Sequence, residues 1–427
     1  MKQSSYFIMA LIMLIFLPSV AGAGSPIQKG ERLDLQRCIK TAIENHPALQ
    51  AARNNVLVGE SRIGQARANY YPHINWQTDY TRLRPATSRV VERQTQNEYS
   101  STVTLDQMLY DFGKTKTQVN IQKLNTDSFR QDLDNVESEI VLGVKQAYYT
   151  LLQAEKNREV ALETVGQFQH HLEQAKGFFE VGTKPKFDVT KAEVDLSNAV
   201  LNRIRAENAL RIARINLNNA MGIPAAPEYT IDDSLFFQKY QEDLQTALES
   251  AYRNRPDLLS ILKRVEAADQ SINLAKKGYY PYLTGSAGYG FGGGEFPLGE
   301  GWNFGAALNV PIFNGLLTHY QIEEAKANLN VAKANEQALR QLIRLEVEQA
   351  FSNLREAEER TATAQLAVRQ AEENVELANG RYAAGVGNPI EVTDALVSLS
   401  NARTTHIAAL TDYRIAQAGL EKAMGVK

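Results

Sequence analysis

Residues 114–180 read KTKTQVNIQKLNTDSFRQDLDNVESEIVLGVKQAYYTLLQAEKNREVALETVGQFQHHLEQAKGFFE, a stretch of 67 residues without a proline. Only three glycines, Gly143, Gly166 and Gly177, interrupt residues that favour helices. A helix of this length extends about 100 Å at about 1.5 Å per residue. It is not apolar on all sides, which argues against burial in lipid or in one thick core. The stretch therefore predicts a helix that packs side by side with others in an extended assembly.

Other segments also predict helices. A helix of about 50 Å is expected at 187–221, and the later part of the chain has a long helix at 316–382 and a shorter one at 390–424. Two helices that begin at Pro47 and Pro256 would extend about 37 Å each, because proline is tolerated in a first helical turn. A helix of about 37 Å and a helix of about 50 Å, laid end to end, therefore come close to the length of about 100 Å of a long helix.

The sequence also repeats itself. Asn-x-Pro-x-Leu occurs at 45–49 and 254–258, and Tyr-Tyr-Pro occurs at 70–72 and 279–281, in both cases 209 residues apart. Further on, Ala-Met-Gly at 220–222 recurs 203 residues later. The difference of six residues falls in one polar loop of the first copy, between two expected strands. Length variation confined to one loop is what a duplicated structural unit predicts.

The duplication divides the chain into parts. We expect a first structural repeat at 24–222, a connector at 223–243 that lies at mid-height, and a second repeat at 244–427. Residues 1–23 have the features of a signal peptide, with Lys2, a short apolar run and the small-residue site Ala-Gly-Ala. The apolar run of about eleven residues is too short to span a bilayer, so we expect an exported protein.

Segments with a period of two follow each Tyr-Tyr-Pro. Their alternation of apolar and polar residues predicts strand hairpins at about 72–110 and about 281–311. Such strands fit a membrane-spanning barrel. A soluble sheet packed on a core would show the same alternation, and the long helices favour the barrel. We expect the aromatic residues of the apolar face to contact lipid. These are Trp76, Tyr80, Tyr99, Tyr289, Phe291, Trp302 and Phe304.

Four strands cannot close a barrel by themselves. Open strand edges in lipid leave backbone groups unsatisfied, at a cost of several kcal/mol each. Two copies of the chain would give eight strands, whose interior fills with side chains, whereas three copies give twelve strands and leave room for a lumen. The small and polar inner faces suit a lumen. A homotrimer with four strands per protomer is therefore preferred on geometry, and the sequence leaves other numbers open.

Composition narrows the classes of function. The formal net charge of −3 gives no basis for a nucleic-acid partner. The single cysteine, Cys38, permits no intramolecular disulfide and is expected to pack as a small apolar residue on a helix. His170 and His171 are helix neighbours that point about 100° apart, so we interpret them as a solvated surface and expect no metal site. No phosphate loop or catalytic triad is recognisable, so we expect neither enzyme activity nor a cofactor.

Two glycine-containing turns carry a specific resemblance. They read VGTKPKFDV at 181–189 and RYAAGVGNPIEVTD at 381–394, each between a long helix and a shorter one. With the signal peptide and the duplicated helix–hairpin–helix order, they make the chain resemble the TolC family of outer-membrane efflux proteins over essentially its whole mature length. The resemblance implies a mixed α and β membrane protein. Its fold would be a trimeric 12-stranded β-barrel continuous with a long periplasmic α-helical coiled-coil barrel.

In that family the two turns form the periplasmic tip. The resemblance implies that Asp188 and Tyr382 bond between neighbouring helix pairs and hold the tip closed. It also implies that Glu391 and Asp394 contribute to an acidic ring across the constriction. Further tip residues match the positions on which an adaptor protein docks. These are Val181, Gly182, Thr183, Val189, Gly385, Val386 and Gly387.

One position departs from the family pattern. Better-known members have an arginine two residues past the second tip glycine, where this chain has Gly387, and the partner position holds Phe187. The ionic link that the arginine supplies is therefore expected to be missing, which predicts a looser closed state.

The resemblance also implies partners. Family members are joined by a periplasmic membrane-fusion (adaptor) protein to an inner-membrane pump of the RND, ABC or MFS type. The chain would then be a passive exit duct of a tripartite efflux or type I secretion system, embedded in outer-membrane lipid with a large periplasmic part. The alternative is a periplasmic coiled-coil scaffold without a pore. A scaffold would explain the long helices but would leave the amphipathic strands without a role.

Overall fold

The computed structural model describes residues 27–84 and 95–426. The predicted signal peptide, and most of the polar loop after residue 84, lie outside the described residues. Contacts divide the chain into two compact units. Unit 1 consists of the residues up to Pro47 and Gly143–Leu235, and unit 2 consists of Ala48–Leu142 and the residues from Phe236 on. The long helix α3 (Lys114–Glu180) therefore contributes its first part to unit 2 and its second part to unit 1.

Unit 1 combines two short strands with helices. β1 (Arg32–Leu33) pairs in parallel with β4 (Thr230–Ile231). α1 (Leu35–Asn45) follows Asp34, whose carboxylate accepts a hydrogen bond from the Arg37 N–H at 2.7 Å and so caps the helix. Cys38 of α1 is fully buried, which confirms that it packs as a small apolar residue on a helix.

The segment that precedes Leu235 is held against α3 in unit 1. The Tyr148 hydroxyl of α3 donates to the Asp232 carbonyl at 2.8 Å. α4 (Lys186–Ala220) ends just before Gly222, which has a φ of +73°. A side chain there would lie 2.9 Å from the His46 Cα, so both the backbone angle and the close approach require glycine.

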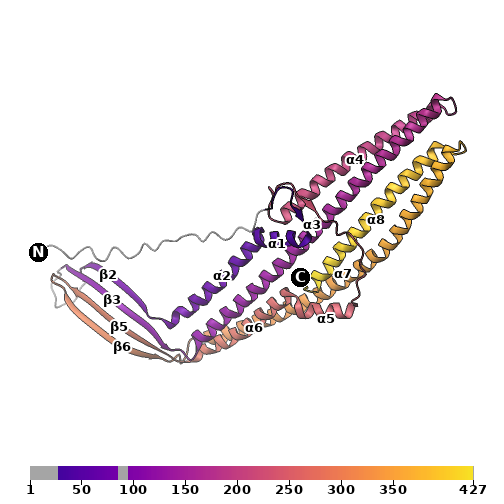
Figure 1. Ribbon diagram of the computed structural model, residues 1–427. Helices are drawn as coiled ribbons and strands as arrows, with labels where there is room; N and C mark the ends of the chain where they lie inside the picture. The colour runs from indigo at the N-terminus through magenta and orange to yellow at the C-terminus, as the bar shows by residue number, and fades with distance from the viewer. Residues whose placement is uncertain (1–26, 85–94, 427) are drawn as a thin grey trace. The chain divides into compact units, whose positions relative to one another are not determined.

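The sheet belongs to unit 2. Its strands are β2 (His73–Leu83), β3 (Gln96–Tyr110), β5 (Tyr282–Gly293) and β6 (Gly299–Asn309). Each strand runs antiparallel to the next in the order β2-β3-β5-β6 (Figure 1). Within the described residues β2 and β6 are therefore the edges of the sheet.

The register of the strands gives the sheet two different faces. One cross-strand row consists of Trp76, Val103, Tyr289 and Trp302. The next row consists of Asn75, Thr104, Gly288 and Asn303. Because successive side chains of a strand point to opposite faces, the first row belongs to an apolar face and the second to a polar face.

The helices of unit 2 begin and end at recognisable signals. α2 (Pro47–Arg67) and α6 (Pro256–Lys276) each begin with proline and continue into one 3₁₀ turn. These 3₁₀ turns are η1 (Ala68–Tyr70) and η2 (Lys277–Tyr279). α5 (Leu244–Asn254) follows Asp243, whose carboxylate accepts a hydrogen bond from the Thr246 N–H at 2.9 Å.

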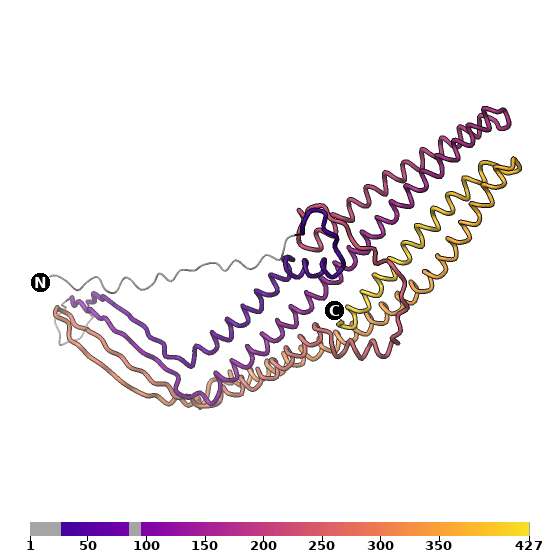
Figure 2. Tube along the Cα trace, viewed as in Figure 1, coloured from indigo at the N-terminus to yellow at the C-terminus, as the bar shows by residue number. Residues whose placement is uncertain are grey.

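The second long helix and its shorter neighbour form a hairpin in unit 2. α7 (Leu317–Ala383) and α8 (Pro389–Ala423) lie side by side and are joined by a short turn (Figure 2). Leu354 of α7 packs in one apolar cluster with Tyr413 and Leu420 of α8. No helix in residues 27–84 or 95–426 combines the length and the apolarity that crossing a membrane would require.

Some helix bounds differ by one residue from the expected ones. α4 spans 186–220 instead of 187–221, α7 spans 317–383 instead of 316–382, and α8 spans 389–423 instead of 390–424. At α8 the reason is a cap, because the Asn388 carboxamide oxygen accepts the Ile390 N–H at 3.0 Å and Pro389 enters the first turn. The bounds of α1 and the short elements α5, β1 and β4 were not expected from the sequence pattern.

Corresponding helices of the two halves have equal lengths. α1 and α5 have 11 residues each, and α2 and α6 have 21 each. α3 and α7 have 67 residues each, and α4 and α8 have 35 each. The two halves of the chain thus contain the same helices in the same order.

Candidate functional site

The first predicted tip turn lies in unit 1, between α3 and α4. Gly182 has a φ of +76°, and its N–H donates to the Phe179 carbonyl at 2.9 Å. The Thr183 N–H donates to the Phe178 carbonyl at 2.9 Å. These bonds satisfy the last carbonyl groups of α3, in the left-handed conformation that glycine permits. Val181 is 71% exposed beside them and is available for contact with another molecule.

Asp188 lies in the first turn of α4 and is buried, with 4% of its surface exposed. His171 of α3 is also buried, whereas its neighbour His170 is exposed. The prediction of a solvated surface is therefore wrong for His171, because the helical turn that directs His170 to solvent directs His171 toward α4. Burial lowers the pKa of His171, and the nearby carboxylates of Asp195 and Asp188 oppose that shift.

The second predicted tip turn lies in unit 2, between α7 and α8. Gly385 has a φ of +78°, and its N–H donates to the Tyr382 carbonyl at 3.1 Å. The Val386 and Gly387 N–H groups both donate to the Arg381 carbonyl, at 3.1 and 2.9 Å. A Cβ atom on Gly387 would lie 2.7 Å from the Tyr382 backbone nitrogen. This close approach is a physical reason why the turn carries glycine rather than arginine at this position.

The two acidic residues of α8 have different surroundings. Glu391 and Asp394 are both exposed, and the Glu391 carboxylate lies 3.1 Å from the Arg381 Nε. Both side chains of this pair are about half exposed, at 57% for Arg381 and 44% for Glu391. Asp394 makes no ion pair within the described residues. The sequence by itself gives Arg381 no role in the site, and the structure shows that its charge compensates that of Glu391 but not that of Asp394.

Tyr382 is 1% exposed, so its ring is part of the core of unit 2. Tyr382 belongs to unit 2 and Asp188 to unit 1, and the predicted bond that involves both positions stays a prediction. Their burial distinguishes them from Glu391 and Asp394, which are open to solvent.

The aromatic residues expected to contact lipid all lie on the apolar face of the sheet. Trp76, Tyr289 and Trp302 share one row, and Tyr80 is paired with Tyr99 in another. Phe291 lies in the row between these two, and Phe304 lies in the next row beyond Trp302. Both are on the same face. Trp302 is 80% exposed, as is Phe304. Contact of this face with lipid stays a prediction, and the alternation that predicts the face is present in the structure.

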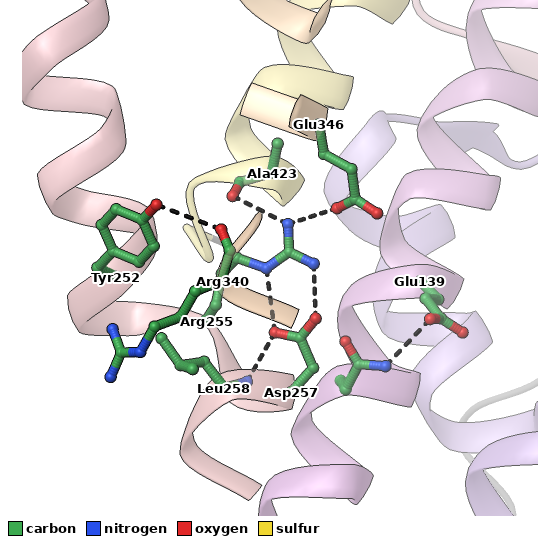
Figure 3. A network of polar contacts seen from close by, with 9 residues as sticks. Glu139, Tyr252, Arg255, Asp257, Leu258, Arg340, Glu346 and Ala423 are labelled. Atoms are coloured by element: carbon green, nitrogen blue, oxygen red, sulfur yellow. Dashed lines mark hydrogen bonds and ion pairs between the residues drawn. The ribbon is translucent and has the colours of Figure 1, made fainter. Parts of the chain in front are cut away.

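A buried ionic network in unit 2 was not foreseen from the sequence. Figure 3 shows the Arg255 guanidinium between two carboxylates, with Asp257 at 2.6 Å and Glu346 of α7 at 2.5 Å. Only 4% of the Arg255 side chain is exposed. Burial raises the pKa of Asp257, but the Arg255 guanidinium, together with the Leu258 N–H and the Lys422 charge, outweighs this and holds the pKa below its ordinary value. The network joins the break between α5 and α6 to α7, and Arg255 Nη1 also approaches the Ala423 carbonyl of α8 at 3.5 Å.

Side chains that could ligate a metal are not gathered anywhere in the described part of the chain. Among residues 27–84 and 95–426, no group of three His, Cys, Asp or Glu residues has a suitable arrangement. The chemistry that the geometry offers is therefore hydrogen bonding and charge at the helix turns, together with the two faces of the sheet.

Comparison with known proteins identifies related chains. The family model described as outer membrane efflux protein matches residues 38–223 and 247–426. The outer membrane protein TolC of Vibrio cholerae serotype O1 is 25% identical over 295 residues, which cover 67% of each chain. Protein CyaE of Bordetella pertussis is 24% identical over 407 residues, which cover 94% of this chain and 85% of that protein.

The fold is also similar to that of a solved structure. The crystal structure of the Campylobacter jejuni CmeC outer membrane channel superimposes with a TM-score of 0.79 and 18% identity, covering 92% of this chain and 85% of that chain. At this identity the likeness concerns the fold.

Proposed function

Since the chain belongs to the outer membrane efflux protein (TolC) family and is located in the outer membrane with a large periplasmic part, we propose that it is the exit channel of an export system. That family consists of efflux proteins rather than enzymes. The observation that carries the proposal is a four-stranded sheet with one apolar face, one polar face and two open edges, attached to helices of 67 residues.

The barrel would be closed by three copies of the chain. In the described residues β2 and β6 lack a strand on one side, and in lipid such edges must find partners. Pairing β6 of one copy with β2 of the next would give twelve strands around a lumen. The apolar face with Trp76 and Trp302 would then contact lipid, and the polar face with Asn75 and Asn303 would line the lumen.

The internal duplication supports the same assembly. Equal helix lengths in the two halves are what a duplicated unit of helix, hairpin, long helix and shorter helix would retain. The first unit would be 24–222 and the second 244–427, with 223–243 as the connector at mid-height. Three copies would then place twelve equivalent helical columns around one axis, in a periplasmic α-helical barrel.

The two helix turns would form the periplasmic tip and gate. Asp188 and Tyr382 would hold neighbouring helix pairs together by hydrogen bonds, worth about 1.5–3 kcal/mol when one group is charged. Asp394 would supply most of the uncompensated charge of the acidic ring, because Arg381 pairs with Glu391. Three copies would bring these carboxylates close together and favour bound cations.

The exposed turns would also receive a partner. Val181 and Val386 are each 71% exposed at the ends of the helix hairpins, where a periplasmic adaptor protein could dock between helices. The adaptor would connect the channel to an inner-membrane pump of the RND, ABC or MFS type, in a tripartite efflux or type I secretion system. The channel itself would be passive, and the pump would supply the energy.

Planar-bilayer recording tests the proposal directly. Detergent-solubilised protein, three chains of 47.5 kDa each less any signal peptide, should migrate at about 140 kDa and conduct ions after insertion. A stable monomer in detergent with its sheet intact would contradict the closed barrel. Protein that washes off membranes with carbonate would instead be the pore-free scaffold.

A further inference from the structure

A cavity of about 840 Å³ lies in unit 2 where the sheet meets the helices. Its walls come from the end of α2, the start of α3, the end of α6 with η2, and the adjoining ends of the strands. His73, Met108 and Tyr282 line it from the sheet, and all three belong to the polar face by their register. A volume of this size is within the range of pockets for drug-sized ligands, about 300–1,000 Å³.

The lining carries excess positive charge. Three basic residues line the cavity: Arg62 of α2, Lys114 of α3 and Lys277 of η2. Among the described residues, Asp111 is the acidic residue that lines it. Arg62 and Lys114 make no ion pair in the part of the chain that the structure describes. Lys277 makes none either, so all three cations lack a carboxylate partner among the described residues.

The remaining charges are held in place by the start of α3. The Asp111 carboxylate accepts the Gly113 N–H at 2.9 Å and the Thr115 N–H at 2.6 Å, so it caps the helix. The Lys277 ammonium donates to the Gly113 carbonyl and to the Thr117 hydroxyl, both at 2.8 Å. Both acceptors are neutral, so these bonds fix the position of the ammonium without cancelling its charge. An ammonium group has three donors, and one of them is still available.

Part of the cavity lining is less polar. Leu274, Tyr280, Pro281 and Pro311 line it and offer apolar and aromatic surface to a ligand. The cavity thus combines cations with apolar contacts, a combination that suits an amphipathic ligand.

We propose that this cavity binds an amphipathic organic anion, whose acidic group contacts Arg62, Lys114 and Lys277 and whose apolar body packs on Leu274 and Tyr280. The inference rests on the proposed channel function, because the polar face of the sheet would line the lumen. The ligand is then a solute in transit rather than a lipid headgroup, since lipid would contact the face of Trp76 and Trp302. The site lies at the junction of barrel and helices, apart from the acidic tip.

Calorimetric titration of the full chain in a neutral detergent tests the site, with 1-naphthalenesulfonate as the probe and 1-naphthalenemethanol as its uncharged analogue. The double variant Arg62→Gln, Lys114→Gln should bind the sulfonate at least about tenfold more weakly and the alcohol unchanged, because it loses two charged contacts. The matched control is Arg67→Gln, Lys116→Gln, which removes two exposed cations of the same helices that do not line the cavity. The control should bind like the unmodified protein.

Three results would overturn the site. They are absence of sulfonate binding, equal binding by the double variant, and preferential binding of short-chain phosphatidylglycerol, which would identify a lipid site instead. Conductance of the same preparation separates this inference from the channel proposal. Charge-dependent binding without conductance would support the binding site and contradict the channel function. Conductance with unchanged binding in the double variant would support the channel function and contradict the binding site.

Discussion

At the scale of single residues, three glycines at the helix turns are required for two different reasons. Gly182 and Gly385 have positive φ angles, and a Cβ atom on either would have open space around it. For these two the backbone conformation alone excludes other residues. Gly387 has no positive φ, and what excludes a side chain there is the Tyr382 backbone nitrogen at 2.7 Å. Substitution of Gly182 or Gly385 should therefore strain the backbone of the turn that contains it. Substitution of Gly387 should instead displace the backbone of the turn between α7 and α8.

Gly182→Ala should destabilise the end of α3 by about 1–2 kcal/mol, because a residue with a Cβ atom is strained in the left-handed region. Gly177→Ala is the matched control, since Gly177 lies in the same helix with open space around its Cβ position, and this change should stabilise the helix by about 0.5–1 kcal/mol. Hydrogen exchange of the amides at 178–183 measures both effects. Equal exchange rates in the two variants would show that the turn does not depend on the φ of Gly182.

The ion pair at the second turn leads to a prediction about cation block. Arg381→Gln should increase block of the channel by multivalent cations, because it uncovers the charge of Glu391. Asp394→Asn should weaken the block, and the double variant Arg381→Gln, Glu391→Gln should change it little, since it removes both members of a pair whose charges cancel. Single-channel conductance in the presence of a trivalent cation measures all three variants. Identical behaviour of the double variant and Asp394→Asn would mean that Arg381 does not compensate the charge of Glu391.

At the scale of elements, the halves of the chain have the same helices but different contacts. Arg255 closes a buried ionic network at the break between α5 and α6, with Asp257 and with Glu346 of α7. The corresponding break between α1 and α2 has His46 and Ala48, and Gly143 stands at the position that matches Glu346. The ionic tie is therefore a property of the second half alone, and its loss should affect unit 2.

Asp257→Asn should lower the free energy of unfolding by about 3 kcal/mol at pH 7, because it leaves a buried guanidinium with less compensation. The pKa of Asp257 is lowered in the folded state, so its contribution to stability is complete above the ordinary value of 3.8 and is lost as the pH falls through the folded value. The variant should accordingly lose less stability than the unmodified protein on acidification below that value. Urea unfolding at pH 7 and at lower pH, followed by circular dichroism, measures this.

An exposed ion pair provides the control for this prediction. Glu348→Gln removes the partner of Arg344 on α7, where the two side chains are 41% and 68% exposed. Such a pair contributes about 0–1 kcal/mol, so the control should stay close to the unmodified protein at both pH values. An Asp257→Asn variant as stable as this control would contradict the structural importance of the buried network.

At the scale of the whole molecule, the proposed assembly assigns a different environment to each face of the sheet. Phe304 and Ala307 lie three residues apart on β6 and point to opposite faces. Phe304 is 80% exposed on the apolar face, a degree of exposure that is unfavourable for a phenylalanine in water and favourable in lipid. In the proposed barrel, β6 would contact lipid through one face and the lumen through the other.

Phe304→Lys should reduce the amount of trimer recovered from outer membranes, because a lysine on a lipid-facing barrel position costs about 2–4 kcal/mol near the bilayer centre. Ala307→Lys, on the polar face of the same strand, should assemble normally. Native electrophoresis of detergent extracts measures the trimer. Equal yields from both variants would indicate that the apolar face does not contact lipid.

Local patterns in the sequence were sufficient for much of this protein. Absence of proline from 114–180 predicts the long helix, and alternation after Pro72 and Pro281 predicts the strands and which residues share a face. Gly182 and Gly385 mark the helix turns. These features depend on backbone sterics and on short-range periodicity, which neighbouring residues specify among themselves.

Other features required the tertiary structure. The burial of His171, the Arg255 network and the pair of Arg381 with Glu391 depend on which helix lies opposite, and Arg255 and Glu346 are 91 residues apart. The cavity with Arg62, Lys114 and Lys277 combines three helical segments whose relation no local period encodes. The physical reason is that long-range electrostatics and burial depend on distances between side chains, and only folding brings distant parts of the chain within a few ångströms of each other.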